Sequence, residues 1–136
     1  MILFDANVLI HAFRSDATDH QRYKAWLESV INGPSAFGVS TQVLATMIRI
    51  CTHPRVFRHP SSLAEALEFC RVLLQQPNAT LVSPGKQHWS LFESACEAFD
   101  AKGNLVQKAW FAALAIESGC EWTTTDPDYG RFKKVF

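Results

Sequence analysis

The sequence lacks an excess of charge of either sign. Its 136 residues include 13 lysines and arginines and 13 aspartates and glutamates, so the formal net charge is zero. A neutral chain has no whole-molecule attraction for nucleic acid, so any such binding must come from a local basic patch. With 48% hydrophobic and only 19% charged residues, the composition excludes a disordered chain and is typical of a globular domain.

The sequence also lacks CxxC pairs, long apolar runs and a positively charged leader. Its four cysteines mostly stand among apolar neighbours, as in "IRICT" and "LEFCRVLL", which favours buried thiols in a reducing compartment over a disulfide framework. Asp5 and Asn7 interrupt the apolar start "MILFDANVLI". We therefore expect a cytoplasmic protein with neither a signal peptide nor a membrane-spanning helix.

Repeats, low-complexity tracts and linkers are absent too, so we expect one domain over residues 1–136. Short apolar runs alternate with stretches of helical spacing. Strands are expected at residues 2–4, 36–40, 79–83 and 120–126, and helices at 7–13, 20–31, 41–53, 61–77, 86–101 and 105–118. This alternation predicts an α/β fold whose parallel sheet is covered by helices on both faces.

Two expected strands end on an aspartate, at Asp5 and Asp126, and Asp128 follows closely. Ligands bind outside the carboxyl ends of parallel strands, so these acids should meet at one edge of the sheet. An aspartate after a strand is also a common helix cap or turn residue. The acids therefore indicate either a functional site or ordinary capping.

Lys108 and Thr46 are expected at the same edge. The helix that carries Lys108 leads directly into the last strand and is nearly as long, so its start should lie beside Asp126. Thr46 stands in the second turn of the helix that follows the strand at 36–40. The alternative for Lys108 is a side chain that extends along the surface into water.

Four segments resemble VapC-type PIN-domain toxins in order and spacing: "MILFDANVLI", "VLATMIRICTHPRVF", "GNLVQKAWFAALAIESG" and "TTTDPDYGRF". The resemblance implies a three-layer α/β/α fold with a mostly parallel sheet. It also implies a cytoplasmic toxin paired with a VapB-type antitoxin, a homodimer, and Mg²⁺- or Mn²⁺-dependent endoribonuclease activity. In this family, carboxylates hold divalent ions that activate a water for attack on an RNA phosphodiester.

By this resemblance, Asp5 and Asp126 match catalytic, metal-binding acids, and Asp128 matches a further acid of many members. Two positions depart from the family, because Thr46 stands where it has a glutamate and Lys108 where it has an aspartate. Each unit of charge lost ~5 Å from a divalent ion costs up to several kcal/mol at an effective dielectric of ~20. We therefore expect weak metal binding and an ion pair from Lys108 to Asp5 or Asp126.

Other residues have less specific patterns. Arg49, Arg55 and Arg58 form a candidate RNA-binding patch, although cations at a helix end are also common on solvated surfaces. Asn7 and Thr125 flank the two aspartates and are candidates to hydrogen-bond them from a second shell, or to act as ordinary caps.

Three functions remain open from the sequence. The first is a toxin endoribonuclease with a depleted acidic site, and the second is a catalytically weak or inactive PIN domain that binds antitoxin and RNA. The third is a phosphatase of the haloacid dehalogenase type with Asp5 as nucleophile. It fits poorly because Asn7 stands where that motif needs a second acid.

Overall fold

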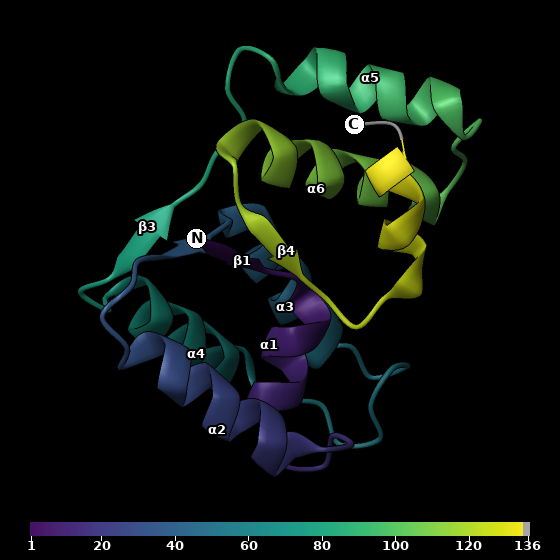
Figure 1. Ribbon diagram of the computed structural model, residues 1–136. Helices are drawn as coiled ribbons and strands as arrows, with labels where there is room; N and C mark the ends of the chain where they lie inside the picture. Colours follow the sequence, from purple (N-terminus) through teal and green to yellow (C-terminus); the bar gives the residue numbers. More distant parts are fainter. Residues whose placement is uncertain (135–136) are drawn as a thin grey trace.

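The computed structural model describes residues 1–134 and has a parallel sheet at its centre (Figure 1). The strands are β1 (Ile2–Phe4), β2 (Phe37–Val39), β3 (Ala79–Leu81) and β4 (Glu121–Thr123). Their order is β3-β2-β1-β4, and each neighbouring pair is parallel. The predicted parallel sheet is confirmed, and the carboxyl ends of its strands share one edge.

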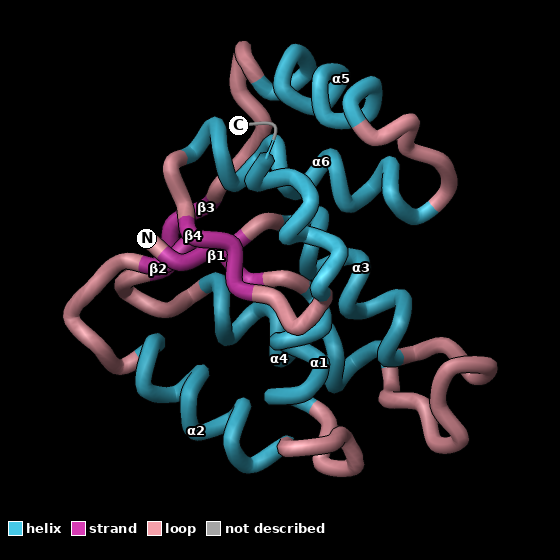
Figure 2. Tube along the Cα trace, turned by 45° about the vertical axis from the view of Figure 1, so that its right-hand side comes forward, coloured by secondary structure: helices cyan, strands magenta, loops and turns pink. Residues whose placement is uncertain are grey.

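Helices cover both faces of the sheet, as expected. They are α1 (Ala6–Phe13), α2 (His20–Ile31), α3 (Thr41–Cys51), α4 (Leu63–Leu74), α5 (His88–Ala98), α6 (Asn104–Ser118) and the 3-10 helix η1 (Pro127–Lys134). Figures 1 and 2 show α5 and α6 on one side of the sheet and α1, α2 and α4 on the other. This is the three-layer α/β/α arrangement of the predicted fold class.

Short polar side chains begin several of the helices. Ser40 Oγ accepts a hydrogen bond from the amide of Val43, and Ser62 Oγ accepts one from the amide of Glu65. Such bonds satisfy amides that have no partner within the helix. Helix α6 ends at Gly119, whose φ of 68° lies in the left-handed region that favours glycine. The chain then turns back into β4.

The core lies on both faces of β1 and β2 and contains two of the cysteines. Leu3 and Phe37 are fully buried, and Cys51 and Cys70 pack in the same cluster. Cys96 and Cys120 are half-buried, and all four thiols are free, as predicted. Within residues 1–134, no helix has the length and apolar character needed to span a membrane.

Strand β4 is shorter than the sequence predicted. The expected strand ran to Asp126, but pairing with β1 ends at Thr123. The cause is a local turn in which Thr124 Oγ accepts from the amide of Asp126 at 3.0 Å. Asp126 Oδ1 then accepts from the amide of Asp128 at 2.9 Å and starts η1. Asp126 therefore caps a short helix instead of ending a strand.

Candidate acidic site

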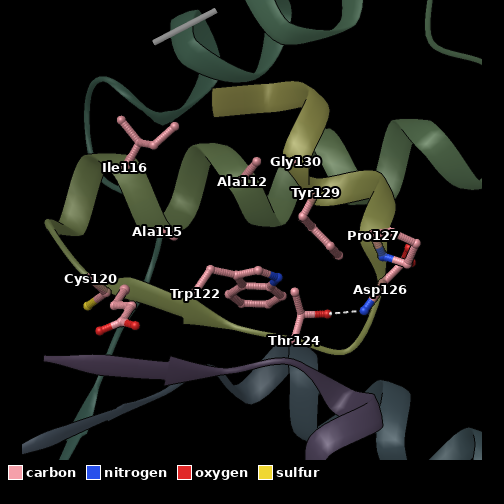
Figure 3. A pocket seen from close by; sticks show the side chains of 11 residues that line it. Ala112, Ala115, Ile116, Cys120, Trp122, Thr124, Asp126, Pro127, Tyr129 and Gly130 are labelled. Carbon is pink, nitrogen blue, oxygen red and sulfur yellow. Dashed lines mark hydrogen bonds between the residues drawn. The ribbon is translucent and has the colours of Figure 1, made fainter. Parts of the chain in front are cut away.

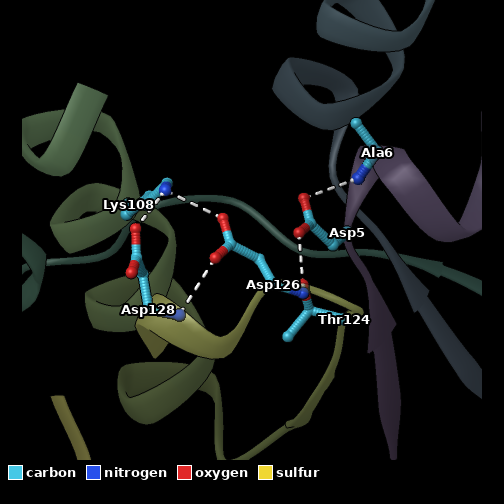
Figure 4. A network of polar contacts seen from close by, with 6 residues as sticks. All are labelled: Asp5, Ala6, Lys108, Thr124, Asp126 and Asp128. Carbon is cyan, nitrogen blue, oxygen red and sulfur yellow. Dashed lines mark hydrogen bonds and ion pairs between the residues drawn. The ribbon is translucent and has the colours of Figure 1, made fainter. Parts of the chain in front are cut away.

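Asp5 joins β1 to α1 and lies at the carboxyl edge of the sheet (Figure 4). It is only 7% exposed. Its Oδ1 accepts from the amide of Ala6 at 2.7 Å, and its Oδ2 accepts from Thr124 Oγ at 2.6 Å. Burial raises the pKa of Asp5 above its ordinary range, although both hydrogen bonds oppose this shift. Each carboxylate oxygen thus already has a protein donor.

Thr124 links Asp5 to Asp126. Its hydroxyl donates to Asp5 and accepts from the amide of Asp126, so one side chain fixes the distance between two acidic loops. The sequence had suggested Asn7 and Thr125 for this supporting role. Both are exposed, and within residues 1–134 neither hydrogen-bonds Asp5 or Asp126. The position of Thr124 two residues before Asp126 is the signal for such a turn.

Lys108 forms the predicted ion pair with Asp126. Its Nζ lies 2.9 Å from Asp126 Oδ2 and 2.6 Å from Asp128 Oδ2 (Figure 4). The side chain is 24% exposed, so it does not extend into bulk water. The ammonium lies between Asp126 and Asp128, whereas Asp5 is bound by Thr124 and the amide of Ala6. Of the two partners expected for Lys108, the structure shows Asp126 and adds Asp128.

The charges of this cluster stabilise one another. Hydrogen bonds to Asp128 and Asp126 raise the pKa of Lys108 above its ordinary value. Partial burial pushes the pKa of Asp126 upward, but the Lys108 ammonium and the Asp128 amide outweigh it, and the pKa is lowered. Both groups are consequently charged at neutral pH.

Thr46 is bound within its own helix. Its hydroxyl donates to the carbonyl of Gln42, one turn earlier in α3, at 3.0 Å. A threonine in a helix commonly satisfies its hydroxyl in this way. Its side chain therefore brings no negative charge to the edge, and its described hydrogen bond goes to backbone instead of to an aspartate.

The acids as they stand do not fit a divalent metal ion. Among residues 1–134, no group of three or more His, Cys, Asp or Glu side chains could hold one. Mg²⁺ and Mn²⁺ need several carboxylate oxygens, but the Lys108 ammonium binds both Asp126 and Asp128 and leaves Asp5 as the one acid of the three that is not paired with it. A positive head group already stands between two of the candidate ligands, so a cation would be repelled.

A hollow of about 650 Å³ adjoins Asp126 on the α6 side of β4 (Figure 3). Trp122 and Tyr129 line it, with ring centroids 5.3 Å apart, and Ala112 and Ala115 of α6 form its back. Burial, and then the nearby carboxylates, raise the pKa of the Tyr129 phenol, so it remains protonated at neutral pH. This hollow is largely apolar and has two acids, Glu121 and Asp126, in its lining.

The three candidate arginines lie on the surface. Arg49 is in the last turn of α3, while Arg55 and Arg58 follow in the loop before α4. All three are exposed, and none pairs with a carboxylate of the described part of the chain. Their charges are thus available to a polyanion.

The PIN-domain family profile matches residues 2–135. Ribonuclease VapC43 of Mycobacterium tuberculosis is 36% identical over 135 residues, which cover 99% of this chain and 92% of the relative. These matches assign the chain to a different family from the phosphatases of the haloacid dehalogenase type, so that alternative is wrong.

Solved structures share the fold. One is VapBC2 of Rickettsia felis bound to a promoter DNA fragment, with a TM-score of 0.69, 13% identity, and coverage of 100% of this chain and 96% of that one. Another is VapC20 of Mycobacterium tuberculosis, a toxin that cleaves the sarcin-ricin loop, with a TM-score of 0.61, 17% identity, and coverage of 96% and 94%. The chain belongs to the PIN-domain family and is of the VapC type.

Proposed function

We propose that this chain, as one PIN domain over residues 1–136, is the cytoplasmic toxin component of a VapBC-type module. It is an endoribonuclease whose cleavage of RNA phosphodiester bonds is strongly reduced in the present sequence. The relatives named as ribonucleases support the activity. The observation that carries the reduction is the pair of contacts from Lys108 to Asp126 and Asp128.

The proposed roles follow from position. Asp5 and Asp126 are the catalytic acids, Asp5 at the carboxyl edge and Asp126 just beyond β4, and Asp128 is the third metal-binding acid. Mg²⁺ or Mn²⁺ would be held by these acids and would supply an activated water only where Lys108 no longer pairs with Asp126 and Asp128. Compared with the glutamate of the family, Thr46 removes one negative charge. Compared with the aspartate of the family, Lys108 changes the local charge by two. Loss of these charges weakens divalent-ion binding by orders of magnitude.

The partners we propose are a VapB-type antitoxin, RNA and a second copy of the chain. A fold match to the VapBC2 assembly supports the antitoxin partner. The exposed Arg49, Arg55 and Arg58 support contact with RNA phosphates, since unpaired surface arginines attract a polyanion at little desolvation cost.

A second candidate function is a non-catalytic PIN domain that keeps its binding surfaces. The same observation favours it, because an ammonium between two carboxylates neutralises their repulsion without a metal ion. The two candidates differ in whether the unmodified chain turns over RNA at all.

The test is to restore the acids. With Mn²⁺ present, the Thr46→Glu/Lys108→Asp protein should cleave a structured RNA at least ~100-fold faster than the unmodified chain. Lys102→Asp is the matched control, because Lys102 is exposed, forms a surface ion pair with Asp100, and undergoes the same charge reversal away from the site. It should leave the rate unchanged.

The outcomes separate the candidates. Slow cleavage by the unmodified chain that Asp5→Asn abolishes supports the reduced nuclease. An unmodified chain that binds RNA without cleaving it supports the non-catalytic domain. If the unmodified chain cleaves as fast as the double variant, the charge argument fails.

A further inference from the structure

A second, smaller hollow adjoins the acidic site from the α2 side of β4. It has a volume of about 350 Å³ and is lined by one cation, two aromatic rings, one valine and three consecutive threonines: Arg22, Tyr23, Trp26, Val8, Thr123, Thr124 and Thr125. We propose that this hollow binds one nucleotide of an RNA strand beside the acidic site. The proposal deepens the RNA-directed function proposed above and rests on it.

Thr124 is shared between the hollow and the acids. It lines the hollow, and its hydroxyl donates to Asp5 at 2.6 Å. A nucleotide in the hollow would therefore place its phosphate about one side chain away from Asp5 and Asp126. The volume also falls within the range of about 300–1,000 Å³ that is typical of small-molecule sites.

The aromatic walls are held in fixed orientations. Tyr23 stacks on His11, with ring centroids 4.9 Å apart and planes 22° apart. Trp26 packs edge-to-face against the buried Phe4, with centroids 5.7 Å apart. Rings that are already oriented lose little entropy when a base stacks on them, and every base offers a flat face.

Arg22 is available to a phosphate. Its side chain is 72% exposed, and it meets Asp19 at 3.6 Å in a surface pair of the kind that contributes little. Its guanidinium lies 5.3 Å from the centroid of the Tyr23 ring. The charge can thus turn toward a phosphate near a base on Tyr23 without the loss of a strong interaction.

Charge distinguishes this hollow from the larger one in Figure 3. The larger hollow is lined by Glu121 and Asp126, whose carboxylates repel a phosphodiester. Among the residues that the structure describes, the lining of the smaller hollow includes one arginine and no acid. An RNA strand should therefore place a nucleotide in the smaller hollow, on the α2 side of β4.

The test measures binding of a hexaribonucleotide to the full chain in the presence of EDTA, which prevents metal-dependent cleavage. Arg22→Gln should weaken RNA binding about fivefold to tenfold. It should also reduce, by about one, the steepness with which the logarithm of the association constant falls with the logarithm of salt concentration. Lys24→Gln is the matched control, since Lys24 is exposed on the same helix and does not line the hollow. It should change affinity less than twofold.

The aromatic contact is tested in parallel. Tyr23→Leu should weaken binding about tenfold, whereas Tyr23→Phe, which keeps the ring, should bind like the unmodified chain. Circular dichroism checks that both variants fold. If Tyr23→Leu folds and binds normally, or if Lys24→Gln weakens binding as much as Arg22→Gln, the proposal is overturned.

A nucleoside monophosphate alone distinguishes a free nucleotide from a strand. We expect it to compete with the hexamer only at much higher concentration, and equal affinity would overturn the strand assignment. If the Thr46→Glu/Lys108→Asp protein cleaves RNA while the Arg22 and Tyr23 variants bind RNA normally, only the proposed nucleotide site in the smaller hollow is refuted. Absence of both RNA binding and restored cleavage would refute the proposed function as well.

Discussion

Arg14 and Lys108 each anchor a loop through aspartate side chains, but they differ in burial and in the kind of partner. Arg14 has only 6% of its side chain exposed and donates to Asp16, to Ser61 Oγ and to the carbonyl of His59. Its guanidinium also lies 3.7 Å from the centroid of the Phe57 ring. Lys108 is more exposed and contacts two carboxylates.

The two cations differ in the kinds of oxygen that they bind. The donors of Arg14 are distributed over hydroxyl, carbonyl and carboxylate oxygens, which tie the loops at 14–19 and 52–62 together. The ammonium of Lys108 instead meets two acids near the carboxyl edge of a parallel sheet, where ligands bind. We therefore expect Arg14 to contribute mainly to stability, and Lys108, by its location, to affect the proposed activity.

The largest expected effect on stability comes from Arg14. Arg14→Ala removes several charged hydrogen bonds and leaves the His59 carbonyl without its donor, so unfolding free energy should fall by about 3 kcal/mol. Urea denaturation measures this loss. Arg22→Ala, at an exposed arginine with one loose ion pair, should cost less than about 0.5 kcal/mol. Equal losses would show that burial does not separate the two arginines.

A smaller effect is expected at Thr124. Thr124→Val keeps the shape but removes both hydrogen bonds that join Asp5 to the loop of Asp126, at a cost of about 1–2 kcal/mol. Thr125→Val at the exposed neighbour should change stability by less than about 0.5 kcal/mol. Thermal unfolding of the two variants compares them directly. A larger loss at Thr125 would move the supporting role back to the residue that the sequence had suggested.

The smallest effect is a dependence of stability on alkaline pH. Because folding raises the pKa of Lys108 above 10.5, its contribution is fully present below that value and is lost as pH rises through the raised pKa. Lys108→Met should therefore be less stable than the unmodified chain by about 1 kcal/mol at pH ~8, and the difference should be smaller at pH ~12. Urea denaturation at both values checks this. A difference that persists undiminished at the higher pH would rule out the ion pairs as its source.

Much of the fold could be predicted because its signals are local. The bounds of α2 match the helical spacing of residues 20–31, and Ser40 and Ser62 cap α3 and α4. The position of Lys108 beside Asp126 also followed, since α6 runs back along β4 through the turn at Gly119. These features depend on periodicity, capping and element length.

Other features depend on side-chain directions that spacing does not fix. The threonine run "TTTD" favours a strand by propensity, but the Thr124 hydroxyl bonds the Asp126 amide and ends it. Thr46 was placed in the correct turn of α3, yet its hydroxyl bonds Gln42. The hollow at Tyr23 depends on how α2 packs after Asp19, whose φ of 58° no residue pattern predicts.

The central claim is that Lys108 takes the place of a divalent cation, and calorimetric titration with Mn²⁺ tests it most directly. The unmodified chain should show no saturable binding in the micromolar range, whereas the Thr46→Glu/Lys108→Asp protein should bind at least ~100-fold more tightly. Equal affinity of the two proteins for Mn²⁺ would contradict the account.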